Sequence, residues 1–215
     1  AQIVVGGGEQ ATTAGELGDG AGDELGAGAT PGQPHAIVLG PSGMGAEAGA
    51  ALVDHPDVSK ITFTGSDKTG GMIYSQAAKH IKRVSLELGG KGANLIFADA
   101  GAKGVEYGAS RCFRNSGQSC NAPTRMLVES SFYDEAVEIA SRVAEETKVG
   151  PASEEGKQIG PVVSEAQYNK IQGLIEKGME EARLTAGGLG RPDGLNRGYY
   201  VKPTVFADVT NDMTI

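Results

Sequence analysis

The 215-residue sequence lacks features that would assign it to several classes of protein. It has no tryptophan, only two cysteines, and no apolar run near the roughly 20 residues that cross a bilayer. Its 27 acidic residues outnumber the 19 basic ones, and no basic cluster is dense enough for a nucleic-acid surface. The first eight residues predict no secretory leader. We therefore expect a reducing, cytoplasmic compartment, no membrane segment and no nucleic-acid partner.

Glycine, in contrast, is abundant, and its placement affects the expected structure. Eleven of the 34 glycines fall within the first 40 residues, where they weaken a helical pattern over residues 9–33. Beyond residue 36, short apolar segments alternate with helical ones, which is typical of a parallel sheet with crossover helices. The expected strands are 2–5, 36–39, 60–64, 82–88, 93–97, 124–128, 184–186 and 199–205, and the expected helices are 9–33, 46–54, 68–79, 103–115, 132–147 and 164–181. This order predicts an α/β fold with a parallel open sheet and a boundary near Gly89–Lys91.

The two cysteines lie in different contexts. Cys120 follows a predicted helix on a glycine-containing loop, where a substrate could approach its thiol. The alternative is a small buried hydrophobic residue, the commonest role of a cysteine outside disulfides. Cys112 lies within the apolar pattern of its helix, so we expect it in the core. Eight residues separate the two, and the histidines show no ligand spacing, so we expect no metal site.

A second candidate is Glu87, which lies between two leucines near the end of a predicted strand. A carboxylate there would be partly desolvated, and a raised pKa would suit it to act as a general base. It could equally be a structural glutamate in a salt bridge. A third feature is Thr64-Gly65-Ser66, which joins a strand to a helix. Ser66 or Asp67 could cap this helix, and free backbone N–H groups there could hold a pyrophosphate.

Four segments occur together in an order that resembles the NAD(P)-dependent aldehyde dehydrogenase superfamily: Phe63–Ser66, Leu86–Lys91, Gly117–Cys120 and Gly198–Val205. The resemblance covers nearly the whole chain, most securely from Gly40 onward. It implies that residues 1–89 are the second half of a Rossmann-like cofactor domain. Residues 90–215 would then be an α/β catalytic domain that is incomplete at its carboxyl end.

The resemblance also implies a role for individual residues. Cys120 matches the nucleophile that attacks an aldehyde, giving a thiohemiacetal and then a thioester, and Glu87 matches the base that activates water. Ser66 matches a pyrophosphate contact, Thr64 lies where the nicotinamide would be, and the carbonyl of Leu88 would receive its carboxamide. Gly65 belongs to the same cofactor-binding turn. The product would be a carboxylic acid.

Near the amino terminus the chain departs from the family pattern. Glu9 keeps an acidic position that accepts ribose hydroxyls and favours NAD over NADP, whereas Gly6 replaces the expected lysine. Two alternatives stay open: a non-catalytic relative with a weakened cofactor site, and a semialdehyde dehydrogenase that acylates coenzyme A. Because Glu87 is retained, hydrolysis is favoured over acyl transfer. Other family residues would lie outside 1–215, so we expect the chain alone to be poorly active. The full-length protein would be a homo-oligomer, either a dimer or a tetramer.

Overall fold

A computed structural model describes residues 2–6, 45–156 and 158–215. The chain divides into two compact units, one of residues 11–88 and one of residues 1–10 together with 89–215. The division after Leu88 lies beside the expected boundary. The expected helix 9–33 and strand 36–39 fall outside the described residues, as does Glu9. The two units are described separately below.

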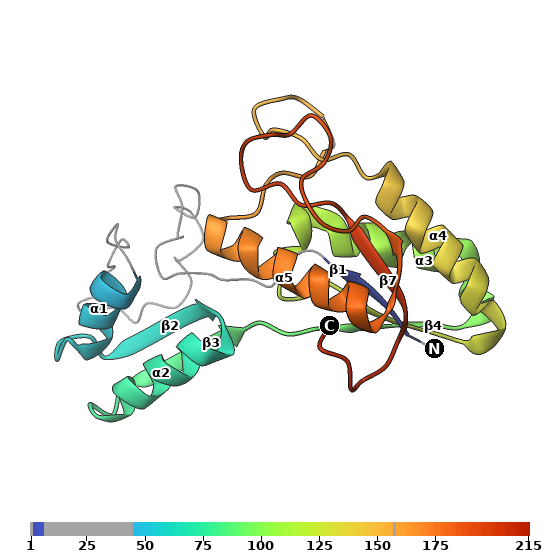
Figure 1. Cartoon of the computed structure of the whole chain (residues 1–215). Helices are drawn as coiled ribbons and strands as arrows, with labels where there is room; N and C mark the ends of the chain where they lie inside the picture. The colour runs from blue at the N-terminus through green and yellow to red at the C-terminus, as the bar shows by residue number, and fades with distance from the viewer. Residues whose placement is uncertain (1, 7–44, 157) are drawn as a thin grey trace. The chain divides into compact units, whose positions relative to one another are not determined.

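The smaller unit contains a parallel pair of strands with a helix against it (Figure 1). Its elements are the π-helical turn η1 (Gly45–Gly49), α1 (Ala50–Asp54), β2 (Lys60–Gly65), α2 (Asp67–Ala78) and β3 (Arg83–Leu88). These bounds agree with the expected helices and strands to within one or two residues. The chain runs from β2 through α2 to β3, so it forms the crossover unit that the alternating sequence pattern predicted.

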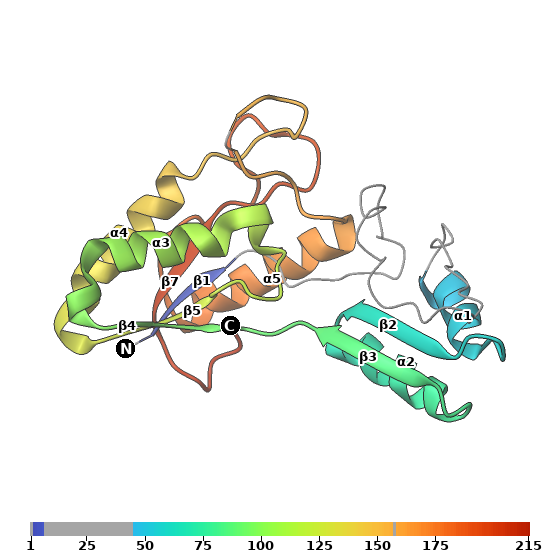
Figure 2. The same ribbon diagram turned by 180° about the vertical axis from the view of Figure 1, so that it is seen from behind.

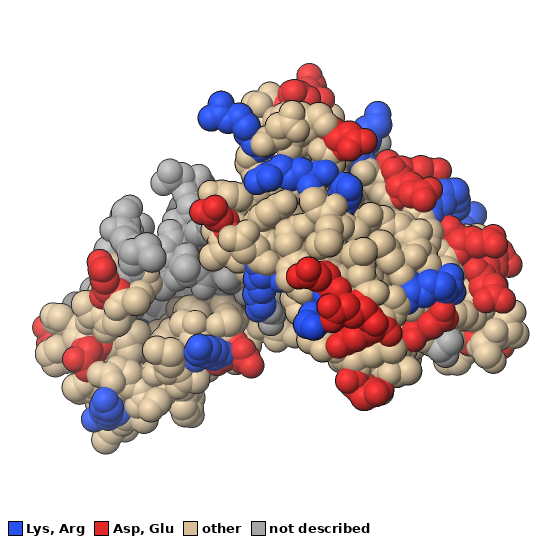
Figure 3. Space-filling model, viewed as in Figure 1, with Lys and Arg blue, Asp and Glu red and all other residues tan. Residues whose placement is uncertain are grey.

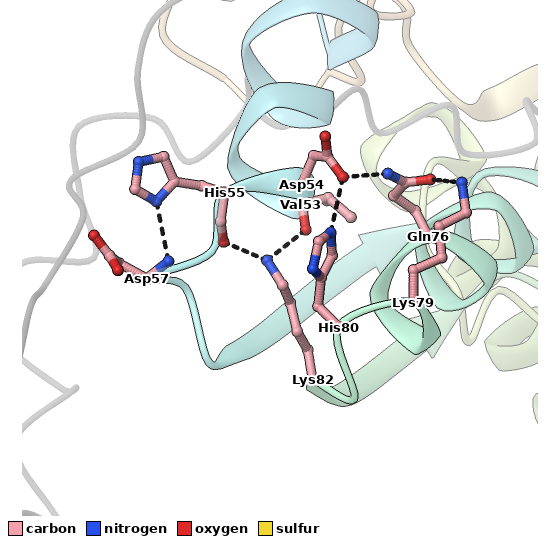
Figure 4. A network of polar contacts seen from close by, with 8 residues as sticks. All are labelled: Val53, Asp54, His55, Asp57, Gln76, Lys79, His80 and Lys82. Carbon is pink, nitrogen blue, oxygen red and sulfur yellow. Dashed lines mark hydrogen bonds and ion pairs between the residues drawn. The ribbon is translucent and has the colours of Figure 1, made fainter.

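Polar contacts tie this unit together at the end where β2 and β3 begin (Figure 4). The Nζ of Lys82 donates to the carbonyl of Val53 at 2.7 Å and also to the carbonyl of His55, so it closes the carboxyl end of α1. His80 Nε2 lies 3.1 Å from the carboxylate of Asp54, which also accepts from Gln76. The densest basic cluster of the sequence therefore contributes structural contacts within the unit.

The larger unit is built on a five-stranded sheet with the order β4-β5-β1-β7-β6. Its elements are β1 (Gln2–Gly6), β4 (Ala93–Ile96), η2 (Ala98–Ala100), α3 (Gly101–Phe113), η3 (Arg114–Gly117), β5 (Arg125–Val128), η4 (Ser130–Phe132), α4 (Tyr133–Glu146), α5 (Glu165–Glu181), β6 (Arg183–Ala186) and β7 (Thr204–Val209). Only β4 and β5 pair in parallel, whereas β1 is antiparallel to β5 and β7, and β6 is antiparallel to β7. The α/β fold is thus present, but the sheet of this unit is mixed rather than wholly parallel.

Strand β1 differs from the expected domain division. It was expected with residues 1–89 in the cofactor domain, but it pairs with β5 and β7 in the larger unit. The β-branched residues that predicted a strand carry no information about which strands it joins, because pairing depends on long-range register.

Helices cover both faces of this sheet (Figures 1 and 2). One apolar cluster joins α3 and α4 to the sheet and includes the fully buried Val105, Met126 and Val205. A second cluster, around Ile171 and Phe206, packs α5 against the opposite face. Neighbouring residues of β7 enter different clusters because successive side chains of a strand point to opposite faces.

The last strand begins later than expected. The sequence predicted a strand over residues 199–205, but β7 begins at Thr204, directly after Pro203. A proline has no N–H to donate to a sheet, so the ladder begins after it. Near the end of β7, Asp208 adopts a left-handed conformation with φ of 61°. The hydroxyl of Tyr133 accepts from the N–H of Asp208 at 2.7 Å and lies 3.2 Å from the carbonyl of Gln2.

On the face drawn in Figure 3, acidic side chains are prominent over α4 and α5, with Lys and Arg among them. Arg142 donates to Glu106 at 2.7 Å, and Lys177 donates to Glu180 at 2.6 Å. Some of the acidic side chains are thus paired with basic ones, although acidic residues outnumber basic ones in the sequence.

Candidate functional site

Two of the predicted site segments meet at one edge of the smaller unit. In the parallel register of β2 and β3, Thr64 lies opposite Glu87 and Gly65 opposite Leu88. Both strands end here, and α2 begins immediately after Ser66. Open α/β sheets bind ligands outside the carboxyl ends of their strands, so this edge is the place where a cofactor would be expected.

Ser66 caps α2, as the sequence predicted. Its Oγ accepts from the N–H of Thr69 at 3.2 Å and lies 3.0 Å from the Thr69 hydroxyl. The N–H of Gly70 donates to the carbonyl of Ser66 at 2.9 Å and starts the helical hydrogen bonds. Asp67 accepts from the N–H of Lys68 at 2.8 Å. The start of this 12-residue helix is therefore ordered, and its partial positive charge favours an anion.

Gly70 is a residue of this edge that the sequence reasoning missed. It is buried, and a Cβ atom there would lie 2.7 Å from Cδ2 of Leu88. The missing side chain thus lets the first turn of α2 lie close to the end of β3. Its spacing of four residues from Ser66, one helical turn, is a signal that could have identified it.

Glu87 is placed differently from the sequence prediction. Its flanking leucines suggested partial desolvation, but Glu87 is exposed. Along β3 the exposed Ser85 and Glu87 alternate with the half-buried Val84 and Leu86. Residues i and i+2 of a strand share a face, so a leucine on either side indicates burial of the opposite face and not of the glutamate. The expectation of a desolvated carboxylate is therefore wrong for this chain, and the structure shows no salt bridge of Glu87 among the described residues.

This edge offers several groups of the kind that a dinucleotide binds, although the N–H groups of Lys68 and Thr69 already donate to Asp67 and Ser66. The helix start can face a pyrophosphate, the exposed Thr64 supplies a hydroxyl, and the backbone of Leu88 ends the neighbouring strand. Gly70 lets α2 and β3 lie close together, since a side chain at residue 70 would displace the side chain of Leu88.

The larger unit carries the two cysteines in opposite environments. Cys120 is exposed on the loop between η3 and β5, so the alternative of a small buried hydrophobic residue does not hold. Cys112 is fully buried in α3, as predicted, and burial raises the pKa of its thiol to about 12. At neutral pH Cys112 is therefore protonated and unreactive, which leaves Cys120 as the accessible thiol.

The loop before Cys120 has an unusual backbone. Asn115 and Ser116 have φ values of 51° and 56°, and Gly117 follows at 76°, so three consecutive residues are left-handed. Before them Arg114 already leaves the helical conformation, with ψ of 141°, so α3 ends at Phe113 and not at residue 115 as expected. Cys120 then lies in a turn closed by the N–H of Ala122 and the carbonyl of Ser119, 3.1 Å apart. Among the described residues, the N–H of Cys120 donates no hydrogen bond and is open to a ligand.

The predicted site residues thus fall into two groups. Thr64, Gly65, Ser66, Glu87 and Leu88 lie together in the smaller unit, and Cys120 lies in the larger one. The described parts of the chain contain no group of three or more His, Cys, Asp or Glu residues arranged to hold a metal ion. In the same residues, each helix is too short or too polar to span a bilayer.

Comparison with known proteins relates the chain to one family. The aldehyde dehydrogenase family model matches residues 29–215. A 3-succinoylsemialdehyde-pyridine dehydrogenase of a Pseudomonas species is 46% identical over 81% of this chain and 37% of its own length. The peroxisomal aminoaldehyde dehydrogenase 1 of Pisum sativum is 43% identical over 86% of this chain, again covering 37% of its length. The chain therefore spans little more than a third of these relatives.

Solved structures give the same result. An aldehyde dehydrogenase of Bartonella henselae superimposes with a TM-score of 0.79 at 55% identity, covering 81% of this chain and 37% of its own. A mutant aldehyde dehydrogenase C of Pseudomonas syringae, crystallised with NAD+ and octanal, gives 0.79 at 41% identity over 81% of this chain and 36% of its own. Because the family model covers most of the chain and these structures share its α/β fold, the chain belongs to the aldehyde dehydrogenase family.

Proposed function

We propose that this chain is the central part of an enzyme that oxidises an aldehyde to a carboxylic acid with NAD as cofactor. The observation that carries the proposal is the exposed thiol of Cys120, which lies on an ordered turn in a chain of this family. The open N–H of Cys120 also supports the proposal, because it can donate to an oxygen that becomes negatively charged.

The proposed reaction begins at Cys120. Its thiolate forms a bond to the aldehyde carbon, and the C=O electron pair moves to oxygen, where the N–H of Cys120 stabilises the charge. NAD+, when bound, would supply the acceptor for the hydride of this carbon, and the C=O bond re-forms as that hydride leaves. The acyl group is then held on Cys120 as a thioester.

Glu87 completes the proposed cycle. Its carboxylate takes a proton from a water molecule, whose oxygen bonds to the thioester carbon, and the Cys120 thiolate leaves. Each turnover converts one aldehyde, one NAD+ and one water into a carboxylate, NADH and two protons. Glu87 is exposed here, so a water molecule can reach it.

In the proposal the cofactor lies at the edge formed by β2 and β3. Ser66 and Gly65 would hold the pyrophosphate at the start of α2, Thr64 would lie beside the nicotinamide, and the Leu88 carbonyl would accept from its carboxamide. Glu9, outside the described residues, would select NAD over NADP by accepting ribose hydroxyls. An aldehyde dehydrogenase of Bacillus cereus was solved with NAD+, and it is 43% identical over 80% of this chain.

Three finer statements also belong to this proposal. The substrate is an aldehyde, as the names of the relatives and the octanal complex suggest. The full-length enzyme is a homo-oligomer, and it works in the cytoplasm, although one relative is named as peroxisomal. The family match does not favour a non-catalytic protein or one that acylates coenzyme A.

The test uses full-length enzyme and follows NADH formation with a panel of aldehydes. Cys120→Ser should abolish turnover while NAD binding, measured by calorimetry, is unchanged. Glu87→Gln should slow the release of carboxylate, identified by mass spectrometry, and leave the first burst of NADH intact. Equal turnover by wild type and Cys120→Ser would refute the assignment of the nucleophile.

A further inference from the structure

The loop that carries Cys120 is attached to a distant segment by two hydrogen bonds. The Oγ of the buried Ser116 donates to the carbonyl of Gly160 at 2.6 Å. The Oε1 of Gln118 accepts from the N–H of Val163 at 2.9 Å. One bond uses a side-chain donor and the other a side-chain acceptor, so together they hold the loop to residues 159–163 just before α5.

That segment is itself fixed by the rest of the larger unit. The N–H of Ile159 donates to the carbonyl of Lys148 at 2.9 Å, and its carbonyl accepts from Gly150 at 3.0 Å. The N–H of Val162 donates to the carbonyl of Tyr199 at 2.9 Å. The two bonds to Ser116 and Gln118 therefore connect the Cys120 loop to an anchored part of the fold.

The amide of Gln118 also fixes the loop internally. Its Nε2 donates to the carbonyl of Asn115 at 3.0 Å, and the side chain of Asn115 donates back to the carbonyl of Gln118 at 3.0 Å. These bonds span the left-handed residues Ser116 and Gly117. A non-glycine residue in that conformation is strained and persists only where its surroundings fix it.

We propose that Ser116 and Gln118 are positioning residues that hold the thiol and the open N–H of Cys120 in place for attack on the aldehyde. This inference rests on the proposed function, in which Cys120 is the nucleophile. Gln118 holds the loop through both ends of its amide, and Ser116 holds it through its hydroxyl. A displacement of about 1 Å at a reacting group can cost about 10²-fold in rate, so small shifts of this loop matter.

The test compares variants of the full-length enzyme by kcat, by KM for NAD and by the urea midpoint of unfolding. Gln118→Leu, which removes the amide's bonds to Val163 and to Asn115, should lower kcat by about 10-fold to 10²-fold. Ser116→Gly should lower kcat less, because it loses the hydroxyl but relieves the left-handed strain. The KM for NAD should change less than twofold for both. Ser153→Ala, at an exposed serine, is the matched control and should match wild type.

Gln118→Glu adds a second measurement, the pH dependence of activity. A residue that only stabilised the fold would not change this dependence. A protonated carboxyl can accept from Val163 and donate to Asn115 as the amide does, whereas the ionised form cannot donate. A glutamate titrates near pH 4.3; the Asn115 carbonyl, which needs a donor, favours the protonated form at this site, whereas the Val163 N–H also bonds the ionised form. Activity of Gln118→Glu relative to wild type should therefore rise as the pH falls from 8 to 5, while the ratio for Gln118→Leu stays flat.

The outcomes separate the two proposals. If Cys120→Ser is fully active, the proposed function fails. If Cys120→Ser is inactive but Gln118→Leu and Ser116→Gly keep kcat within twofold of wild type, only the positioning role fails. A Gln118→Glu ratio that does not change with pH, despite reduced kcat, also overturns that role. If Gln118→Leu does not fold, Gln118→Glu and Ser116→Gly decide the question.

Discussion

The two units of the chain position their functional residues in different ways. At the edge of the smaller unit the contacts are local: Ser66 bonds Thr69 three residues away, and β2 pairs with the strand that follows the next helix. The Cys120 loop instead depends on partners 44 and 45 residues away, Gly160 for Ser116 and Val163 for Gln118. A strand-to-helix turn can therefore be held in its conformation by nearby residues. The Cys120 loop, in contrast, is held by residues that are distant in the sequence.

The two units also differ in the amount of apolar side chain that they bury, and the larger unit buries more. The larger unit has an apolar cluster on each face of its sheet. The described part of the smaller unit buries Val53, Phe63 and Ala77 but leaves Met72, Tyr74 and Ile81 more than half exposed. A two-stranded sheet with so few buried apolar side chains has marginal stability by itself. The edge formed by β2 and β3 therefore belongs to the less stable of the two units.

The largest expected effect tests whether the core of the larger unit is closed. With iodoacetamide at pH 8, Cys120 should be alkylated at least about 10²-fold faster than Cys112, because a thiol of pKa about 12 is almost entirely protonated there and is fully buried. Peptide mapping by mass spectrometry measures both rates in one sample. Urea at a denaturing concentration is the control and should equalise them. Comparable rates in the native protein would contradict a closed core.

Next in size is the loss of a core side chain. Met126→Ala should lower the free energy of unfolding of the larger unit by about 2–5 kcal/mol, because Met126 is fully buried between helices and sheet. Leu95→Ala, on the neighbouring strand but 62% exposed, is the matched control and should change it by less than about 0.5 kcal/mol. The free energies come from urea unfolding followed by circular dichroism. Similar values for the two variants would show that the sheet is not packed as described.

A smaller effect should show the difference in stability between the two units directly. Amide hydrogens of β2 and β3 should exchange at least about tenfold faster than those of β5 and β7, because the smaller unit buries little apolar surface. Hydrogen exchange resolved by peptide mass spectrometry measures this. Equal protection in the two sheets would remove the contrast in stability.

The smallest expected effect concerns the loss of stability at acidic pH. The hydrogen bond from Arg183 lowers the pKa of Asp208, and that from His80 lowers the pKa of Asp54. A carboxyl whose pKa is lower in the folded state adds stability above its unfolded pKa, and this is lost as the pH falls through the folded value. The contribution of Asp208 should therefore be constant near neutral pH, and both contributions should be lost progressively as the pH falls below about 4. Asp208→Asn and Asp54→Asn should each flatten the fall in urea midpoint between pH 5 and pH 2.5, and an unchanged slope would contradict the pairing.

Much of this could be predicted from the sequence, and the failures have physical causes. The turn at Ser66, the buried Cys112 and the helices flanking them follow from local patterns. The exposure of Glu87 was missed because neighbouring leucines were read without the two-residue period of a strand. The left-handed Asn115 and Ser116, and the partners of Gln118, could not be predicted, since they depend on residues 158–163 far along the chain.

Strand β1 has a consequence for how the chain is made. It lies in the middle of its sheet, between β5 and β7, although it precedes both of these strands in the sequence. Its carbonyl partner Tyr133 and its neighbour β7 emerge about 130 and 200 residues later. The edge of β1 that faces β7 therefore lacks its native partner until residues 204–209 have been synthesised. During that interval its unpaired edge is a place where another chain could pair with it.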